Sequence, residues 1–201
     1  MGKPERTDME RVNFSQMKDG TAEEYFLLRD LEGPFLERTA DRLLDELCRQ
    51  QDDTLEGYRI TRLEHALQCA TRALREGADD DWIVAALFHD IADGLSPQNH
   101  DRAAAEILRP FVREDVCWVV EHHGLFQTFY YGHHYGWDRH ARDAYKDHPS
   151  YGKAVDFCER WDQASFDDSY SWEPIDTFIP IVKRVFRRKA YAMQGGDPRA
   201  A

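Results

Sequence analysis

The stretch from Trp82 to Asp93, WIVAALFHDIAD, contains the longest uninterrupted apolar run of the chain and ends in a histidine and two aspartates. One helix face of this stretch is apolar, at Ile83, Ala86 and Leu87. We therefore predict a helix over residues 80–92 that buries this face. Asp90 is the next residue on the same face. A carboxylate directed into a core is costly unless it is paired or bound to a metal ion, so this helix predicts a polar site inside the protein.

Two other predicted helices end in the same way. In residues 112–124, the apolar positions Val116, Val119 and Val120 lead to His123 on the same face. In residues 150–164, Val155 and Cys158 lead to Asp162. Three separate helices thus direct a side chain that can bind metal toward a core. We expect these side chains to meet in one shared site.

Helical patterns cover most of the remaining chain. Further helices are predicted at 21–32, 34–51, 59–76, 100–109, 137–147 and 174–190, with a break between the first two at Gly33-Pro34. No stretch shows the two-residue alternation of a half-buried strand, so the fold class is predicted to be all-α. We expect an irregular N-terminal segment at residues 1–20, a single domain at 21–193 and a flexible tail at 194–201.

Composition excludes several classes of protein. The chain has 26 basic and 38 acidic residues among 201, a formal net charge of −12, whereas a nucleic-acid-binding protein usually carries the opposite sign. No apolar run is long enough to span a membrane, and the N-terminus lacks the apolar region of a secretory signal. Four cysteines without close spacing indicate reduced thiols. We expect a cytoplasmic protein without nucleic-acid or membrane partners, while the oligomeric state stays open.

The candidate ligands are more numerous than a single metal ion needs. They are His65, His89, Asp90, His100, His123 and Asp162. Four imidazoles and two carboxylates suit two borderline cations such as iron better than one zinc, which takes four ligands. Neighbouring helical residues point about 100° apart. His89 and Asp90 therefore face one centre only at a helix end or through a bridging carboxylate. His122 is the alternative to His123, but it lies off the apolar face.

Three segments in this order carry a resemblance to a known family. They are LEHALQCA at 63–70, ALFHDIADGL at 86–95 and ERWDQ at 159–163. This series resembles the signature of the HD-domain family, a helical bundle around a metal site. His100 and His123 resemble the branch with a dinuclear site, which holds phosphohydrolases and mixed-valent diiron oxygenases. The segment EHHGLFQTFYYGHHYGWDR at 121–139 is similar to the oxygenases that act on (R)-1-hydroxy-2-(trimethylammonio)ethylphosphonate.

The resemblance implies a cofactor and a reaction. Two irons, Fe(II) and Fe(III), would be bridged by Asp90. His65, His89 and Asp162 would complete one iron site, and His100 and His123 the other. The implied reaction uses O₂ to cleave the carbon–phosphorus bond of a small phosphonate, giving glycine betaine and phosphate.

Two other functions stay open. Hydrolytic relatives commonly read HDxGK or HDxGH, whereas this chain has Ala92 and Asp93 at the last two positions, which weakens a phosphohydrolase acting on a nucleotide or phosphoester without removing it. A catalytically idle module that binds a metabolite would have lost metal ligands, and all six are present.

Several residues are candidates for contact with substrate. Aromatic residues crowd the region of Tyr130 and recur around Trp161, and such rings bind quaternary ammonium groups through cation–π attraction; core packing is the competing interpretation. The expected catalytic residues are Tyr58, as a displaceable iron ligand, Asp93 and Gln127. The expected substrate-binding residues are Arg62, Gln127, Tyr130, His133, His134 and Trp161. Some of these residues have a structural alternative. Tyr58 could be a core tyrosine, Arg62 could form an exposed ion pair, and the two histidines could lie in a surface loop.

Overall fold

The computed structural model describes residues 11–52 and 57–188, and these divide into a unit that ends at Thr39 and a unit that begins at Ala40. In the first unit, a short 3₁₀ turn (Met17–Asp19) precedes helix α1 (Ala22–Glu37). Thr21 and Glu24 form a reciprocal capping box at the start of α1. The predicted break at Gly33-Pro34 is wrong, because α1 continues through both residues to Glu37. Proline removes one hydrogen bond from a helix and disfavours it, but here it does not end the helix.

The second unit is built from helices and short helical turns, and its first helix begins one residue before the unit, at Thr39. They are α2 (Thr39–Arg49), η2 (Gln50–Asp52), α3 (Arg62–Arg75), α4 (Asp80–Phe88), α5 (His100–Leu108), α6 (Glu114–Tyr131), η3 (Gly132–Tyr135), η4 (Ala141–Tyr145), α7 (Tyr151–Phe157), the π-helical turn η5 (Cys158–Asp162) and α8 (Ile175–Phe186). The described residues contain no strand. The predicted all-α fold class is confirmed.

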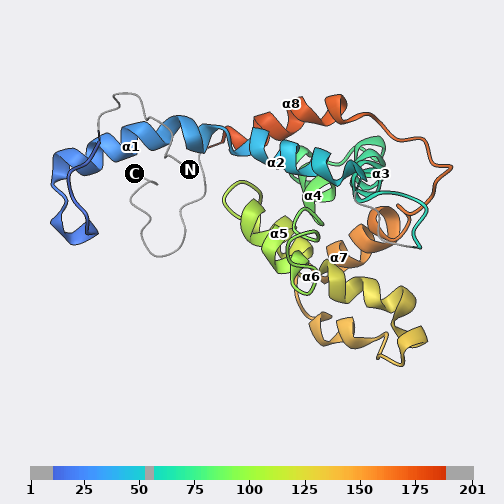
Figure 1. The fold of residues 1–201 in the computed structure, drawn as a ribbon. Coiled ribbons are helices and arrows are strands. Elements are labelled where there is room, and N and C mark those ends of the chain that lie inside the picture. The colour runs from blue at the N-terminus through green and yellow to red at the C-terminus, as the bar shows by residue number, and fades with distance from the viewer. Residues whose placement is uncertain (1–10, 53–56, 189–201) are drawn as a thin grey trace. The chain divides into compact units, whose positions relative to one another are not determined.

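Helix α4 occupies the middle of the core. Residues 83–88 are at most 3% exposed, because this stretch is apolar on every side of the helix and needs partners all round. α3 and α8 pack against α4, α5 packs against α6, and α6 packs against α7 (Figure 1). The polar residues that follow α4 therefore lie inside the helical bundle.

The structure corrects the ends of several predicted helices. α4 ends at Phe88, so His89 and Asp90 lie in the turn that follows, whereas α6 continues to Tyr131. The predicted helix at 137–147 is wrong, since these residues contain only the 3₁₀ turn η4, and a second 3₁₀ turn, η3, precedes them. Gly136 separates them with a φ of +75°, a left-handed conformation that favours glycine and ends a helix.

Other features bear on the remaining predictions. The four cysteines are free thiols. Within the described ranges, no helix is both long and apolar enough to cross a membrane. The predicted tail at 194–201 lies outside the described residues, and the predicted domain boundaries stay predictions.

Candidate metal centre

Six polar side chains from five segments converge beside α4. They are His65 of α3, His89 and Asp90 after α4, His100 at the start of α5, His123 of α6 and Asp162 at the end of η5. All six were singled out in the sequence, and the structure brings all of them together. Their role as metal ligands stays a prediction.

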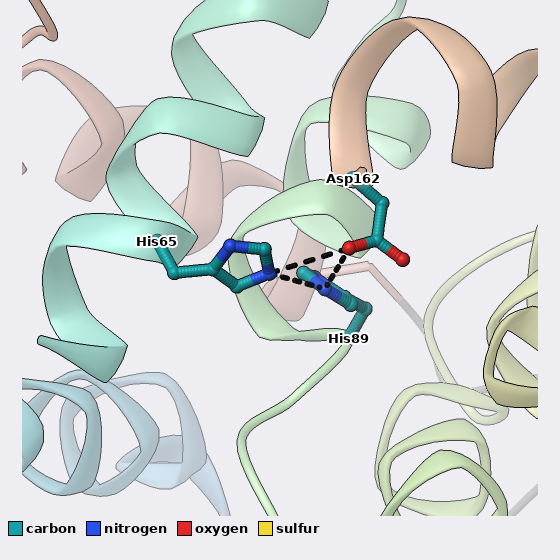
Figure 2. Close-up of side chains that lie close together, drawn as sticks. All are labelled: His65, His89 and Asp162. Carbon is teal, nitrogen blue, oxygen red and sulfur yellow. Dashed lines mark hydrogen bonds and ion pairs between the residues drawn. The ribbon is translucent and has the colours of Figure 1, made fainter. Parts of the chain in front are cut away.

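The first group joins two imidazoles and one carboxylate (Figure 2). The Nε2 atoms of His65 and His89 are 3.2 Å apart. Oδ1 of Asp162 lies 3.4 Å from Nε2 of His65 and 3.5 Å from Nε2 of His89. All three residues are at most 5% exposed, so their polar atoms face one another out of contact with bulk water.

Asp90 lies between this group and two further imidazoles. Its Oδ2 is 3.6 Å from Nε2 of His65 and 3.4 Å from Nε2 of His89. Its Oδ1 is 3.3 Å from Nε2 of His100 and 3.1 Å from Nε2 of His123. The two oxygens of one carboxylate thus face two different pairs of imidazoles.

Backbone carbonyls fix the orientation of the four imidazoles. Each Nδ1 lies 2.6–3.0 Å from a carbonyl oxygen: Ser165 for His65, Ala86 for His89, Pro97 for His100 and Val120 for His123. A carbonyl only accepts hydrogen bonds, so Nδ1 carries the proton. In the neutral ring, each Nε2 therefore presents a lone pair to the cluster.

This arrangement fits a bound metal ion. Lone pairs and carboxylate oxygens that face one another repel unless a cation or protons lie between them, and carbonyl-bound Nδ1 atoms are typical of metal-ligating histidines. Oδ2 of Asp162 is buried without a hydrogen-bond partner. Two overlapping sets of ligand atoms lie close enough to share an ion: His65, His89 and Asp162, and His89, Asp90 and His123. Imidazole and carboxylate donors suit iron, zinc or manganese.

Without metal, the cluster holds protons. Burial alone would lower the pKa values of His65, His89 and His123, but the neighbouring Asp90 and Asp162 carboxylates raise all three above the ordinary value. Conversely, burial raises the pKa values of Asp90 and Asp162, yet the nearby imidazoles bring both well below their usual range. A metal ion must therefore displace protons when it binds.

Two departures from regular α-helix place the ligands. Because α4 ends at Phe88, the turn that follows lets both His89 and Asp90 face the cluster. The π-helical turn η5 then directs Asp162 to the cluster, whereas its neighbour Trp161 contacts Glu76. Single π-helical turns are frequent at functional sites.

A cavity of about 660 Å³ opens beside the cluster. Its lining includes Asp90, Asp162 and every cluster histidine except His89, which is fully buried behind them. Five of the residues predicted to act on substrate also line it: Tyr58, Arg62, Asp93, Gln127 and Tyr130. Nε of Arg62 donates to Oδ2 of Asp93 at 2.7 Å, so the cavity wall contains an ion pair in place of an isolated negative charge.

Three predicted substrate residues lie outside the cavity lining. The indole N–H of Trp161 donates to Oε2 of Glu76 at 2.8 Å, and its ring packs against Trp82. His133 and His134 are exposed on η3 and contact each other. The indole is thus held by a contact outside the cavity, and the two histidines lie on a surface turn; contact of these three residues with substrate stays a prediction.

His122 lies apart from the cluster. Its Nδ1 is 2.8 Å from the carbonyl oxygen of Trp118, and its ring stacks on the Trp118 indole. Of the two adjacent histidines, His123 is the one beside Asp90.

Four aromatic residues that were not singled out as site residues also line the cavity. They are Tyr131, Tyr135, Trp137 and Phe166. The first three lie in the aromatic-rich segment of the sequence, so their density was the available signal. Phe166 stacks on the imidazole of His65, with ring centroids 4.4 Å apart, and no spacing in the sequence indicated this contact. The backbone carbonyl of Ser165 was equally beyond sequence reasoning.

Comparisons with known proteins agree with this geometry. Residues 62–156 match the family model of the HD domain. The chain contains an HD domain. The matched region runs from the start of α3 into α7, and Asp162 lies beyond its end.

One curated protein is also similar to part of the chain. It is the [1-hydroxy-2-(trimethylamino)ethyl]phosphonate dioxygenase (glycine-betaine-forming) of Leisingera caerulea, 33% identical over 86 residues. The match covers 37% of this chain and 44% of the relative. The chain therefore spans less than half the length of the relative it matches. The resemblance inferred from the sequence is confirmed.

Proposed function

We propose that this chain is an O₂-dependent non-haem diiron oxygenase that cleaves the carbon–phosphorus bond of a 1-hydroxyalkylphosphonate. The proposed substrate is (R)-1-hydroxy-2-(trimethylammonio)ethylphosphonate, and the products are glycine betaine and phosphate. One observation carries the proposal: the oxygens of Asp90 face two different pairs of imidazoles. A carboxylate that bridges two metal ions needs this division.

The ligand assignment follows the two pairs. His65, His89 and Asp162 hold one iron, His100 and His123 hold the other, and Asp90 bridges them. The chemistry that the bound irons supply is activation of O₂ and coordination of the substrate's C1 oxygen. The HD domain of this chain and the similar protein that is named a dioxygenase support this assignment.

The cavity offers complementary surfaces for the two ends of such a substrate. Arg62 is the one lysine or arginine among the described residues that line it, and its guanidinium suits a phosphonate oxygen. Gln127 and Tyr130 supply hydrogen-bonding groups from α6. The rings of Tyr131, Tyr135 and Trp137 lie within 6.2 Å of one another, centroid to centroid. Such a set of ring faces suits a trimethylammonium group.

Tyr58 and Phe166 form the wall nearest to His65. Phe166 covers one face of the imidazole, and the Tyr58 ring lies 5.5 Å from the Phe166 ring. The two rings give this side of the cavity an apolar surface. Tyr58 is more than half exposed and has room to move; we retain it as the proposed displaceable iron ligand.

The proposed reaction balances with one O₂ for each substrate. C1 loses its hydrogen and its bond to phosphorus and becomes the carboxylate carbon of glycine betaine. The phosphonate becomes phosphate, the two atoms of O₂ enter the products, and one proton is released. No reductant is consumed in the balanced reaction.

A metal-dependent phosphohydrolase is the alternative, since an HD domain is compatible with both activities. Protein purified from iron-supplied cells separates the two. The proposal predicts about two irons per chain, as the six ligands suit a pair, and an S = 1/2 signal in low-temperature EPR after mild ascorbate reduction. It also predicts phosphate release from the phosphonate only with O₂. Phosphoester hydrolysis without O₂, supported by manganese or cobalt and with no such EPR signal, would favour the hydrolase.

A further inference from the structure

The ion pair between Arg62 and Asp93 connects two segments that carry cluster residues. Arg62 is the first residue of α3, three residues before His65, and Asp93 lies three residues after Asp90. The side chains are only 13% and 17% exposed. Both line the cavity. A partly desolvated ion pair with a 2.7 Å hydrogen bond is stronger than a surface pair, so each side chain restrains the other.

The second oxygen of Asp93 faces His100. Oδ1 of Asp93 lies 3.7 Å from Nδ1 of His100, which also lies 3.0 Å from the carbonyl oxygen of Pro97. In all four cluster histidines, Nδ1 lies beside a backbone carbonyl. His100 also has the Asp93 carboxylate near Nδ1. A carboxylate at this position increases the electron donation of the imidazole to a metal at Nε2.

We propose that Asp93 is a positioning residue that couples Arg62, the cationic group of the cavity wall, to His100. The charge of Asp93 acts on the guanidinium, to which it is hydrogen bonded, and on the His100 imidazole, whose Nδ1 lies 3.7 Å away. An anionic substrate group that binds Arg62 competes with Asp93 for the guanidinium, which leaves more of the carboxylate charge for His100. Binding of the anion then strengthens the hold of His100 on its metal.

This inference rests on the proposed function only in taking His100 as a metal ligand. It replaces a direct catalytic role for Asp93. The hydrolytic pattern has a basic residue where this chain has Asp93. In this chain the cationic group comes from Arg62 of α3, and Asp93 holds it through the ion pair.

Cobalt(II) binding to the metal-free protein tests the coupling without any turnover. We expect the wild-type protein to bind two equivalents of Co²⁺. Asp93→Asn should lower the affinity for one of the two Co²⁺ ions by about 10- to 100-fold, the usual effect of removing an outer partner of a metal ligand. The affinity for the other ion should stay unchanged. Arg62→Gln should instead raise the affinity for that same Co²⁺ ion. The substitution removes a positive charge from the cavity wall and leaves the Asp93 carboxylate without its guanidinium partner, so more of its charge acts on His100.

The ion pair of Asp80 and Arg184 provides a matched control. Nε of Arg184 donates to Oδ2 of Asp80 at 2.6 Å, with the same atoms as the cavity pair, and neither residue lines the cavity. Asp80→Asn should leave both Co²⁺ affinities unchanged. Circular dichroism of the metal-free variants checks that each one is folded.

The outcomes distinguish the two proposals. Unchanged Co²⁺ affinity in Asp93→Asn, or shifts in the same direction for Asp93→Asn and Arg62→Gln, overturns the coupling. A wild-type protein that binds no Co²⁺ overturns the coupling and the metal centre together. Selective weakening in Asp93→Asn, in a protein without O₂-dependent activity, supports the coupling and rejects the oxygenase.

Discussion

Oδ1 of Asp90 lies 3.1 Å from Nε2 of His123, although 33 residues separate them in the chain. On the other side of the imidazole, Nδ1 lies 2.6 Å from the carbonyl oxygen of Val120, one turn earlier in α6. The backbone of α6 thus fixes the ring that faces Asp90. Oδ2 of the same carboxylate faces His65 and His89, so Asp90 is the carboxylate that faces both pairs of imidazoles.

Replacing Asp90 should therefore disrupt both pairs of imidazoles together. We expect Asp90→Ala to bind less than one metal ion per chain and to lose O₂-dependent activity, because both groups of imidazoles lose their shared carboxylate. Elemental analysis and phosphate release measure the two effects. Asp147→Ala, an exposed position away from the cavity, should behave as wild type. Retained turnover in Asp90→Ala would reject the bridging role.

The adjacent histidines of α6 should give opposite results. His123→Ala should lose one metal ion and activity, since His123 lies beside Asp90. His122→Ala should retain both and reduce the free energy of unfolding by about 1 kcal/mol, since it loses its stacking on Trp118. Metal content and urea unfolding test this pair. Metal loss in His122→Ala alone would reverse the assignment.

The sequence predicted the cluster because helical periodicity reports which face of a helix is buried. Asp90, His123 and Asp162 each continue an apolar face, and the structure brings their carboxylate and imidazole groups together. Periodicity does not report where a helix departs from regular geometry. Periodicity therefore gave no sign of the π-helical turn at Asp162, which directs the neighbouring Trp161 to Glu76; Trp161 was expected at the substrate because aromatic residues recur around it. The Arg62–Asp93 pair was missed for a related reason: it joins separate elements, and its partners follow no shared spacing.

The metal-free protein should lose stability as the pH rises above neutrality. The pKa values of His65, His89 and His123 are raised by Asp90 and Asp162. The contribution of these histidines to the stability of the fold is therefore complete below their pKa in the unfolded chain, about 6.5. It is lost as the pH rises through their pKa values in the folded protein. The lowered pKa values of the two carboxylates act oppositely. Their contribution is present above about pH 4 and is lost in more acidic solution.

Thermal unfolding with a chelator, from about pH 5 to about pH 9, should therefore show a midpoint that falls toward the alkaline end. Added metal should stabilise the protein more at the alkaline end, where fewer protons have to be displaced. A midpoint of the metal-free protein that rises with pH across this range would contradict the proton-holding cluster.

The aromatic rim of the cavity should select for positive charge. Trp137→Leu should raise KM for the trimethylammonium phosphonate about fivefold, as expected for the loss of about 1 kcal/mol of cation–π attraction, with kcat unchanged. An analogue with a neutral tert-butyl group should show no such increase. Tyr145→Leu, which removes an exposed ring outside the cavity lining, is the control. An equal rise in KM for both substrates would indicate that Trp137 packs against the substrate without recognising its charge.

Trp161 should affect stability and leave substrate affinity unchanged. Its indole N–H donates to a carboxylate oxygen of Glu76 at 2.8 Å, and the residue is 9% exposed. Trp161→Phe should lower the free energy of unfolding by about 1–3 kcal/mol, because the hydrogen bond to a charged group is lost. Urea unfolding, KM and metal content are measured on the same preparation. A raised KM with unchanged stability and full metal content would return Trp161 to the substrate site. The opposite result, with Trp137→Leu changing only KM, would place the recognition of substrate on the aromatic rim of the cavity and leave Trp161 as support for the turn that carries Asp162.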